Sequence, residues 1–267
     1  MSRRKADSHE ETMRKNKVGV MAMKCFVLFV VFGASYQVIA QDAKTAYTRM
    51  APIEQYLMAD QGAEIALARS AAPESISRDA EVLVLGRHGF ETAVKGKNGF
   101  VCIVERSWTS APDADFWNPN VRTPICYNAA GARSVLVRNL KRTELILAGR
   151  TQAQVDEAIF AAVDKKELPV MEPGAMCYMM SKQGSGGDGG DSVEHGPSHL
   201  MFYLPQTDPA IWGANLPGSP IIGLTDTREH VTTFVIAVQR WSDGTEGREG
   251  PAAEHHQHSK LGLGTKD

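Results

Sequence analysis

After its first 40 residues this chain lacks any hydrophobic run long enough to cross a membrane, and it lacks the short motifs of common enzymes. It contains no Gly-x-Ser-x-Gly of serine hydrolases and no Gly-Lys-Ser/Thr of phosphate-binding loops. Outside those 40 residues it also has no Ser-x-x-Lys of penicillin-recognising enzymes. The sequence therefore carries no strong catalytic or nucleotide signature, and it predicts no transmembrane segment beyond the leader.

Positive charge is also scarce once the leader is set aside. The whole chain has 29 Lys and Arg and 31 Asp and Glu, of which residues 1–40 hold seven and three. The remainder has 22 against 28, a formal charge of −6. Nucleic-acid-binding proteins usually show the opposite sign, concentrated on one face. We therefore expect no nucleic-acid partner.

What residues 1–40 do contain is typical of a secretory signal peptide. Seven basic residues precede or flank an apolar run from Cys25 to Gly33, and Ala40 stands at a small-residue exit before Gln41. The run is shorter than the roughly 20 residues that span a bilayer. An uncleaved anchor, counted back to Val18, is the alternative. We predict cleavage near Gln41 and a soluble protein that is periplasmic or secreted.

Cysteine is rare, with Cys102, Cys126 and Cys177 remaining after the leader. Cys102 and Cys177 lie in apolar runs, where a cysteine behaves as a small buried hydrophobe. Outside the cytoplasm two of the three can oxidise. The spacing does not set Cα distances, so one disulfide that includes Cys126 and no disulfide at all both stay open, and the pairing is not predicted.

Residue periodicity predicts three strands, then two helices, then three strands. An Asn98-Gly99 turn suggests that the first three strands form an antiparallel meander. Such an order favours an α+β fold, with an antiparallel sheet of about six strands and helices on one face. The expected strands are 81–85, 90–95, 100–106, 175–180, 199–204 and 231–239. We expect one domain over residues 41–245 and a disordered tail over 246–267.

Helical signals are clearest in the middle of the chain. Gly149 closes a helix whose apolar residues include Leu136, Leu140 and Leu147, and Thr151 with Gln154 forms a capping box for the next. Val155, Ile159 and Val163 follow at a spacing of four and predict one buried stripe. Residues 45–70 also have helical spacing, which Gly62 divides.

A metal site is one hypothesis for residues 184–198, which are rich in glycine and polar side chains. His195 and His199, with Glu194 beside them, lie too close to Gly196-Pro197 to share a helix, but a loop can bring them together. With Cys177 or His88 as a distant ligand, imidazole and sulfur suit zinc or copper. The alternative is a solvated loop followed by a strand that begins at His199.

An anion site is a second, weaker hypothesis. Positive and imidazole side chains gather in the first predicted turns, at Arg87, His88, Lys95 and Lys97. Charged turn residues are more often simply solvated.

Five segments resemble a group of uncharacterised exported bacterial proteins. They are Val82–Gly89, Asn98–Cys102, Tyr178–Lys182, His199–Phe202 and Trp241–Gly244. The resemblance spans about residues 50–245 and implies bacterial export and a single folded domain. It implies no activity, substrate or cofactor.

We therefore predict a non-catalytic ligand-binding or sensing module in the periplasm or outside the cell. Its partner would be a small molecule or an envelope component. A metal-dependent enzyme that uses His195 and His199 is the alternative function.

Overall fold

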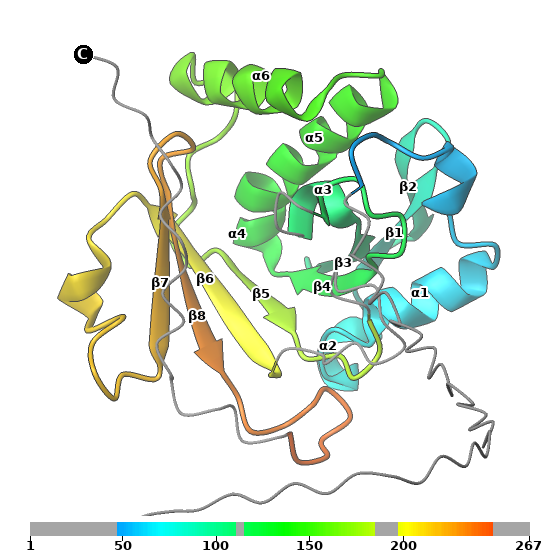
Figure 1. Cartoon of the computed structure of the whole chain (residues 1–267). Helices are drawn as coiled ribbons and strands as arrows, with labels where there is room; N and C mark the ends of the chain where they lie inside the picture. Colours follow the sequence, from blue (N-terminus) through cyan, green and yellow to red (C-terminus); the bar gives the residue numbers. More distant parts are fainter. Residues whose placement is uncertain (1–46, 111–114, 185–196, 248–267) are drawn as a thin grey trace, which may run out of the picture. The chain divides into compact units, whose positions relative to one another are not determined.

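A mixed eight-stranded sheet is the centre of this computed structural model, which describes residues 47–110, 115–184 and 197–247 (Figure 1). The strand order is β2-β1-β3-β4-β5-β6-β8-β7. Neighbouring strands run antiparallel except for β1 and β3, which are parallel. The strands are β1 (Glu81–Gly86), β2 (Gly89–Val94), β3 (Val101–Glu105), β4 (Thr123–Tyr127), β5 (Met176–Met179), β6 (His199–Pro205), β7 (Ile221–Asp226) and β8 (Val231–Ala237).

The α+β class is confirmed, but the antiparallel sheet of six strands is wrong. The first three strands do not form a meander, because β1 lies between β2 and β3 and pairs with β3 in parallel. Asn98 therefore does not turn a hairpin. Its side chain donates to the carbonyl of Ile76 (2.7 Å) and accepts from the amide of Phe100 (3.1 Å), which fixes a longer connection.

Two strands, β4 and β7, were not expected from the sequence. β4 contains Pro124, which has no amide hydrogen to donate. It is tolerated because β5 pairs with β4 only at Cys126 and Tyr127, so Pro124 lies beyond that ladder. β7 contains Gly223. The side chains of Pro209 and Ala214 lie so close to the Cα of Gly223 that a Cβ at this position would clash with them.

The helices follow local signals where those signals are strong. The capping box at Thr151, the buried stripe of α6 and the left-handed Gly149 are all confirmed. The region 45–70 is helical only in part, since α1 begins after Asp60, whose side chain accepts from the amide of Gly62 (2.8 Å). The helices are η1 (Ile53–Gln55), α1 (Gln61–Arg69), α2 (Glu74–Ser77), α3 (Ser107–Ser110), α4 (Ala129–Gly131), η3 (Ala132–Leu136), α5 (Val137–Leu147), α6 (Gln152–Asp164) and η4 (Pro209–Trp212).

Helices cover both faces of the sheet, and the prediction that they lie on one face is wrong. On one face, Ala68 of α1 packs with Cys102 and Val104. On the other, Leu136 packs with Ile103. Consecutive residues of a strand point to opposite faces. The unbroken apolar run of β3 therefore needs cover on both sides.

The turn between β7 and β8 is held against α5 by charge. Arg138 donates to the backbone carbonyl of Glu229 (2.8 Å), and Arg142 pairs with the Glu229 carboxylate. Arg228 in the same turn lies 4.4 Å above the ring of Phe160 in α6. These contacts fix the hairpin tip relative to the two central helices.

The outer edge of β7 is closed by a side chain. The Asn215 side chain accepts from the backbone amide of Gly223 (3.0 Å) and donates to the carbonyl of Gly223 (2.8 Å). The backbone amide of Asn215 donates to the carbonyl of Ile221 (3.0 Å). Unpaired edge groups are a template for pairing with another chain. The Asn215 side chain binds these backbone groups at Gly223, in the middle of β7, so they are not available for pairing with another chain.

Cys102 and Cys126 form a disulfide between β3 and β4, which confirms a bond that includes Cys126, and Cys177 is a buried free thiol. In the described ranges no helix has the length and apolar character needed to cross a membrane. Residues 1–40, with the predicted signal peptide, lie outside the described residues, as does nearly all of the predicted tail.

Candidate functional site

The predicted metal residues are only partly within the described chain. His195 and Glu194 lie outside it, as does the rest of segment 185–196. His199 begins β6, and its Nδ1 lies 2.8 Å from the carbonyl oxygen of Pro197. Among the described residues there is no group of three or more His, Cys, Asp and Glu placed to hold a metal. The site on His195, His199 and Glu194 therefore stays a prediction.

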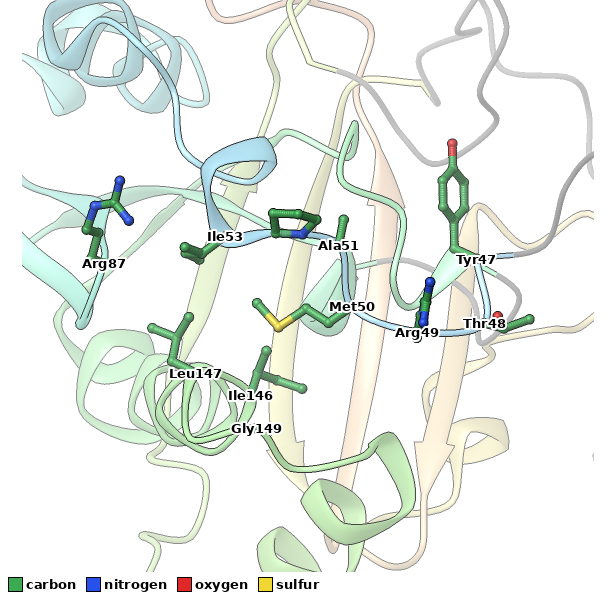
Figure 2. A pocket seen from close by; sticks show the side chains of 11 residues that line it. Tyr47, Thr48, Arg49, Met50, Ala51, Ile53, Arg87, Ile146, Leu147 and Gly149 are labelled. Atoms are coloured by element: carbon green, nitrogen blue, oxygen red, sulfur yellow. The ribbon is translucent and has the colours of Figure 1, made fainter.

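A pocket of about 750 Å³ lies between the segment that precedes η1 and the end of α5 (Figure 2). Its apolar lining includes Met50 and Ile53 on one side and Ile146 and Leu147 on the other. This volume is within the range of small-molecule sites. The full lining is Tyr47, Thr48, Arg49, Met50, Ala51, Pro52, Ile53, Arg87, Ile146, Leu147 and Gly149.

A buried tyrosine positions the segment that forms one wall of this pocket. The Tyr56 hydroxyl accepts from the amide of Ala51 (3.2 Å) and donates to the carbonyl of Trp117 (2.7 Å). Its ring packs against Trp108, with the centroids 5.0 Å apart. Burial raises the pKa of Tyr56, so the hydroxyl keeps its proton for the bond to Trp117. Residues 47–53 are thus tied to the core at a defined point.

The other wall is the last turn of α5. Leu147 is half-buried, so it offers the apolar surface of this wall, and Ile146 behind it is fully buried in the core. Gly149 follows with φ +80°, a conformation that glycine adopts without strain. Nothing lies within 4 Å of where its Cβ would be, so the end of the helix opens toward solvent.

Two guanidinium groups lie at opposite ends of the pocket lining in Figure 2. Arg87 pairs with Glu54 at 2.6 Å, and both side chains are largely exposed. Arg49 has no carboxylate partner among the described residues. Beside Arg49 lie Tyr47 and Thr48, which carry hydroxyl groups. The pocket therefore combines an apolar wall with positive charge at the Arg49 end.

A separate polar cluster is buried beneath α5. Glu105 Oε1 accepts from the hydroxyl of Tyr127 (2.6 Å) and from the side-chain amide of Asn139 (2.6 Å). Burial raises the pKa of Glu105, and the hydrogen bonds from Tyr127 and Asn139 oppose that shift. The cluster joins β3, β4 and α5 in the interior, so we assign it to the fold rather than to the pocket.

This cluster predicts a pH-dependent stability. The pKa of Glu105 in the folded protein lies above the usual 4.5, so the fold favours its protonated form. The stabilising contribution of Glu105 is therefore largest below pH 4.5. That contribution is lost as the pH rises through the folded pKa. We expect Glu105→Gln, which keeps the acceptor oxygen, to become more stable relative to the wild type as the pH rises above 4.5. Urea unfolding from pH 4 to pH 8 measures the difference.

Glu91→Gln is the matched control, because Glu91 is exposed on β2. Its effect is expected to stay within about 0.5 kcal/mol at every pH. A difference between Glu105→Gln and the wild type that does not change with pH would contradict the assignment.

Sequence reasoning found Arg87 as a candidate for anion binding but missed the rest of the pocket. His88, Lys95 and Lys97, named with it, are not in the lining. Arg49 and Met50 lie in the region 45–70, whose spacing predicts a helix. No periodicity indicates that residues 47–53 contact the end of α5, almost 100 positions later in the chain. Only tertiary contacts bring the two segments together.

The sequence matches no protein-family model, and comparisons with curated proteins and with solved structures find no significant similarity. The resemblance to exported bacterial proteins therefore stays a prediction.

Proposed function

We propose that this protein is an exported, non-catalytic binding module and that its pocket takes a small organic ligand with an apolar body and one anionic group. The observation that carries the proposal is the pairing of an apolar wall, which includes Leu147, with the guanidinium of Arg49, for which the described residues hold no carboxylate partner. Binding sites of this size are mostly apolar, with a few polar groups that fix the orientation of the ligand.

In this arrangement the apolar body lies on the end of α5 and the anion on Arg49. A guanidinium binds a carboxylate through two parallel hydrogen bonds, which gives direction as well as charge. Thr48, next to Arg49 in the lining, carries a hydroxyl group as a further donor, whereas the Tyr47 hydroxyl points away from Arg49 (Figure 2). The Arg87 guanidinium already bonds to Glu54, so it contributes less to an incoming anion.

Export is supported by the disulfide between Cys102 and Cys126, since such bonds persist in oxidising compartments. It agrees with the leader in residues 1–40. A ligand-binding module outside the cytoplasm would take its ligand from the periplasm or the medium.

Octanoate, octanol and octylamine test the proposal, because they share one apolar chain and differ in the charge of the head group. We expect saturable binding of octanoate by isothermal titration calorimetry and much weaker binding of the other two. Arg49→Gln should weaken octanoate by about 10- to 100-fold, as a charge-assisted hydrogen bond is worth about 1.5–3 kcal/mol.

Arg150→Gln is the matched control, because Arg150 is exposed just beyond the pocket and does not line it. It should bind octanoate as the wild type does. Equal affinity for octanoate and octanol, or an unchanged affinity in Arg49→Gln, would remove the anion from the proposal. No binding of any of the three compounds would contradict the pocket as a ligand site.

A further inference from the structure

The pairing of β5 with β6 brings sulfur and imidazole side chains together, at a distance from the pocket. Met179 lies directly opposite His199, and Cys177 lies opposite Met201. Cross-strand partners share a face of the sheet, as do residues two apart on one strand. Cys177, Met179, His199 and Met201 therefore occupy adjacent positions on one face.

These four side chains differ in how deeply they are buried. Cys177 is fully buried in the core beneath Leu136. Met179 and Met201 are only half-buried at the margin of that core, and His199 is half-buried beside them. The three side chains nearer the surface are within reach of an ion from solvent, whereas the thiol is not.

The hydrogen bond of His199 leaves one ring nitrogen available. Its Nδ1 lies 2.8 Å from the carbonyl oxygen of Pro197, and a carbonyl only accepts, so Nδ1 carries the proton. Nε2 then keeps its lone pair. A fixed bond on one nitrogen is the usual way in which a ligating histidine is oriented.

A tyrosine links the sulfur atoms of Cys177 and Met201. The Tyr203 hydroxyl lies 3.3 Å from Cys177 Sγ and donates to Met201 Sδ at 3.9 Å. Cys177 is fully buried, so an ion from solvent does not reach its sulfur, and the thiol serves as a neighbour that holds Tyr203 in place.

We propose that Met179, His199 and Met201 form a binding site for one soft monovalent cation, Cu(I). All three ligands are uncharged, the two thioethers are soft and select Cu(I) over hard divalent ions, and imidazole also suits copper. The set uses His199 from the sequence-based hypothesis but replaces His195 and Glu194 with two methionines. It is independent of the pocket.

Competition with a chromogenic Cu(I) chelator under anaerobic, reducing conditions tests this site. The full chain carries other soft ligands, so the measurement uses a background with Cys25→Ser, His255→Asn, His256→Asn and His258→Asn. We expect one equivalent of Cu(I) to bind in this background. Met179→Leu, Met201→Leu and His199→Gln should each weaken it by more than about tenfold, since even the loss of a supporting group costs about 10- to 100-fold.

Met176→Leu is the matched control, because Met176 lies on the same strand but opposite Phe202, on the other face. It should retain the affinity, as should Cys177→Ser. Circular dichroism of each variant shows whether it is folded. Unchanged Cu(I) affinity in Met179→Leu and Met201→Leu would overturn the proposal, and so would a loss in Cys177→Ser equal to that in His199→Gln.

Silver provides a second readout that does not depend on chelators. With 13C-labelled methionine methyl groups, Ag(I) should shift two of the 11 methionine signals, and these should be the ones missing in Met179→Leu and Met201→Leu. A shift confined to other methionines would also overturn the site.

Discussion

Replacing Glu64 with alanine is expected to destabilise the protein by about 3–5 kcal/mol, because it removes the carboxylate that pairs with the buried guanidinium of Arg106. Glu64 Oε1 accepts from Arg106 Nη2 (2.8 Å), and the two side chains are 2% and 0% exposed. The same oxygen accepts from the amide of Leu85 (3.2 Å). Burial lowers the pKa of Arg106, and the Glu64 carboxylate opposes that shift.

Arg106 cannot turn to water when Glu64 is lost, because its other bonds hold it in the core. Nε donates to the carbonyl of Tyr56 (2.7 Å), and Nη1 donates to the carbonyl of Val104. Tyr56 also positions the wall of the pocket. Urea unfolding of Glu64→Ala should therefore show a large loss, and octanoate binding should weaken with it.

Glu54→Ala is the control for this prediction. It removes the exposed ion pair with Arg87, and exposed pairs contribute little. A loss in Glu64→Ala no larger than that in Glu54→Ala would show that the buried pair does not hold α1 to the sheet.

The second large effect concerns the disulfide. Removing it with Cys102→Ala and Cys126→Ala is expected to cost about 2–5 kcal/mol, since the bond closes a loop between positions 24 apart. The closed segment contains Arg106 and the buried side chains of Trp108, Phe116 and Trp117. The unfolded chain regains the freedom of that whole loop when the bond is absent.

The double variant and the reduced wild type should therefore unfold at similar urea concentrations, well below that of the oxidised wild type. Under non-reducing denaturation Cys177 should react with a thiol reagent, whereas Cys102 and Cys126 should not. Reaction at Cys102 and Cys126, or a wild-type midpoint that does not respond to reductant, would contradict the bond.

Much of the local structure could be predicted because its cause is local. The capping box of Thr151 needs only Gln154 three residues later, and the stripe of α6 needs only a spacing of four. Strand alternation likewise placed β1, β3 and β6 close to their observed bounds.

The sites were harder to predict than the elements. Of His195, His199 and Glu194 only His199 lies in the described chain, and its two proposed partners, Met179 and Met201, were not identified. The sequence does contain a signal for this site. Cys177 and Met179 are two residues apart in one predicted strand, and His199 and Met201 are two residues apart in another, so each pair lies on one face of its strand. The pattern becomes informative only when the register of β5 and β6 is known.

The sequence by itself determined the positions of β1, β3, β6 and α6, the burial of Cys102 and Cys177 and the cap at Thr151, since these depend on neighbours along the chain. Only the tertiary structure decided that β1 pairs in parallel with β3, that Pro124 lies within a strand and that residues 47–53 meet the end of α5. Strand partners and pocket walls join distant segments, and the free energy of those contacts depends on the whole packed core rather than on any local pattern.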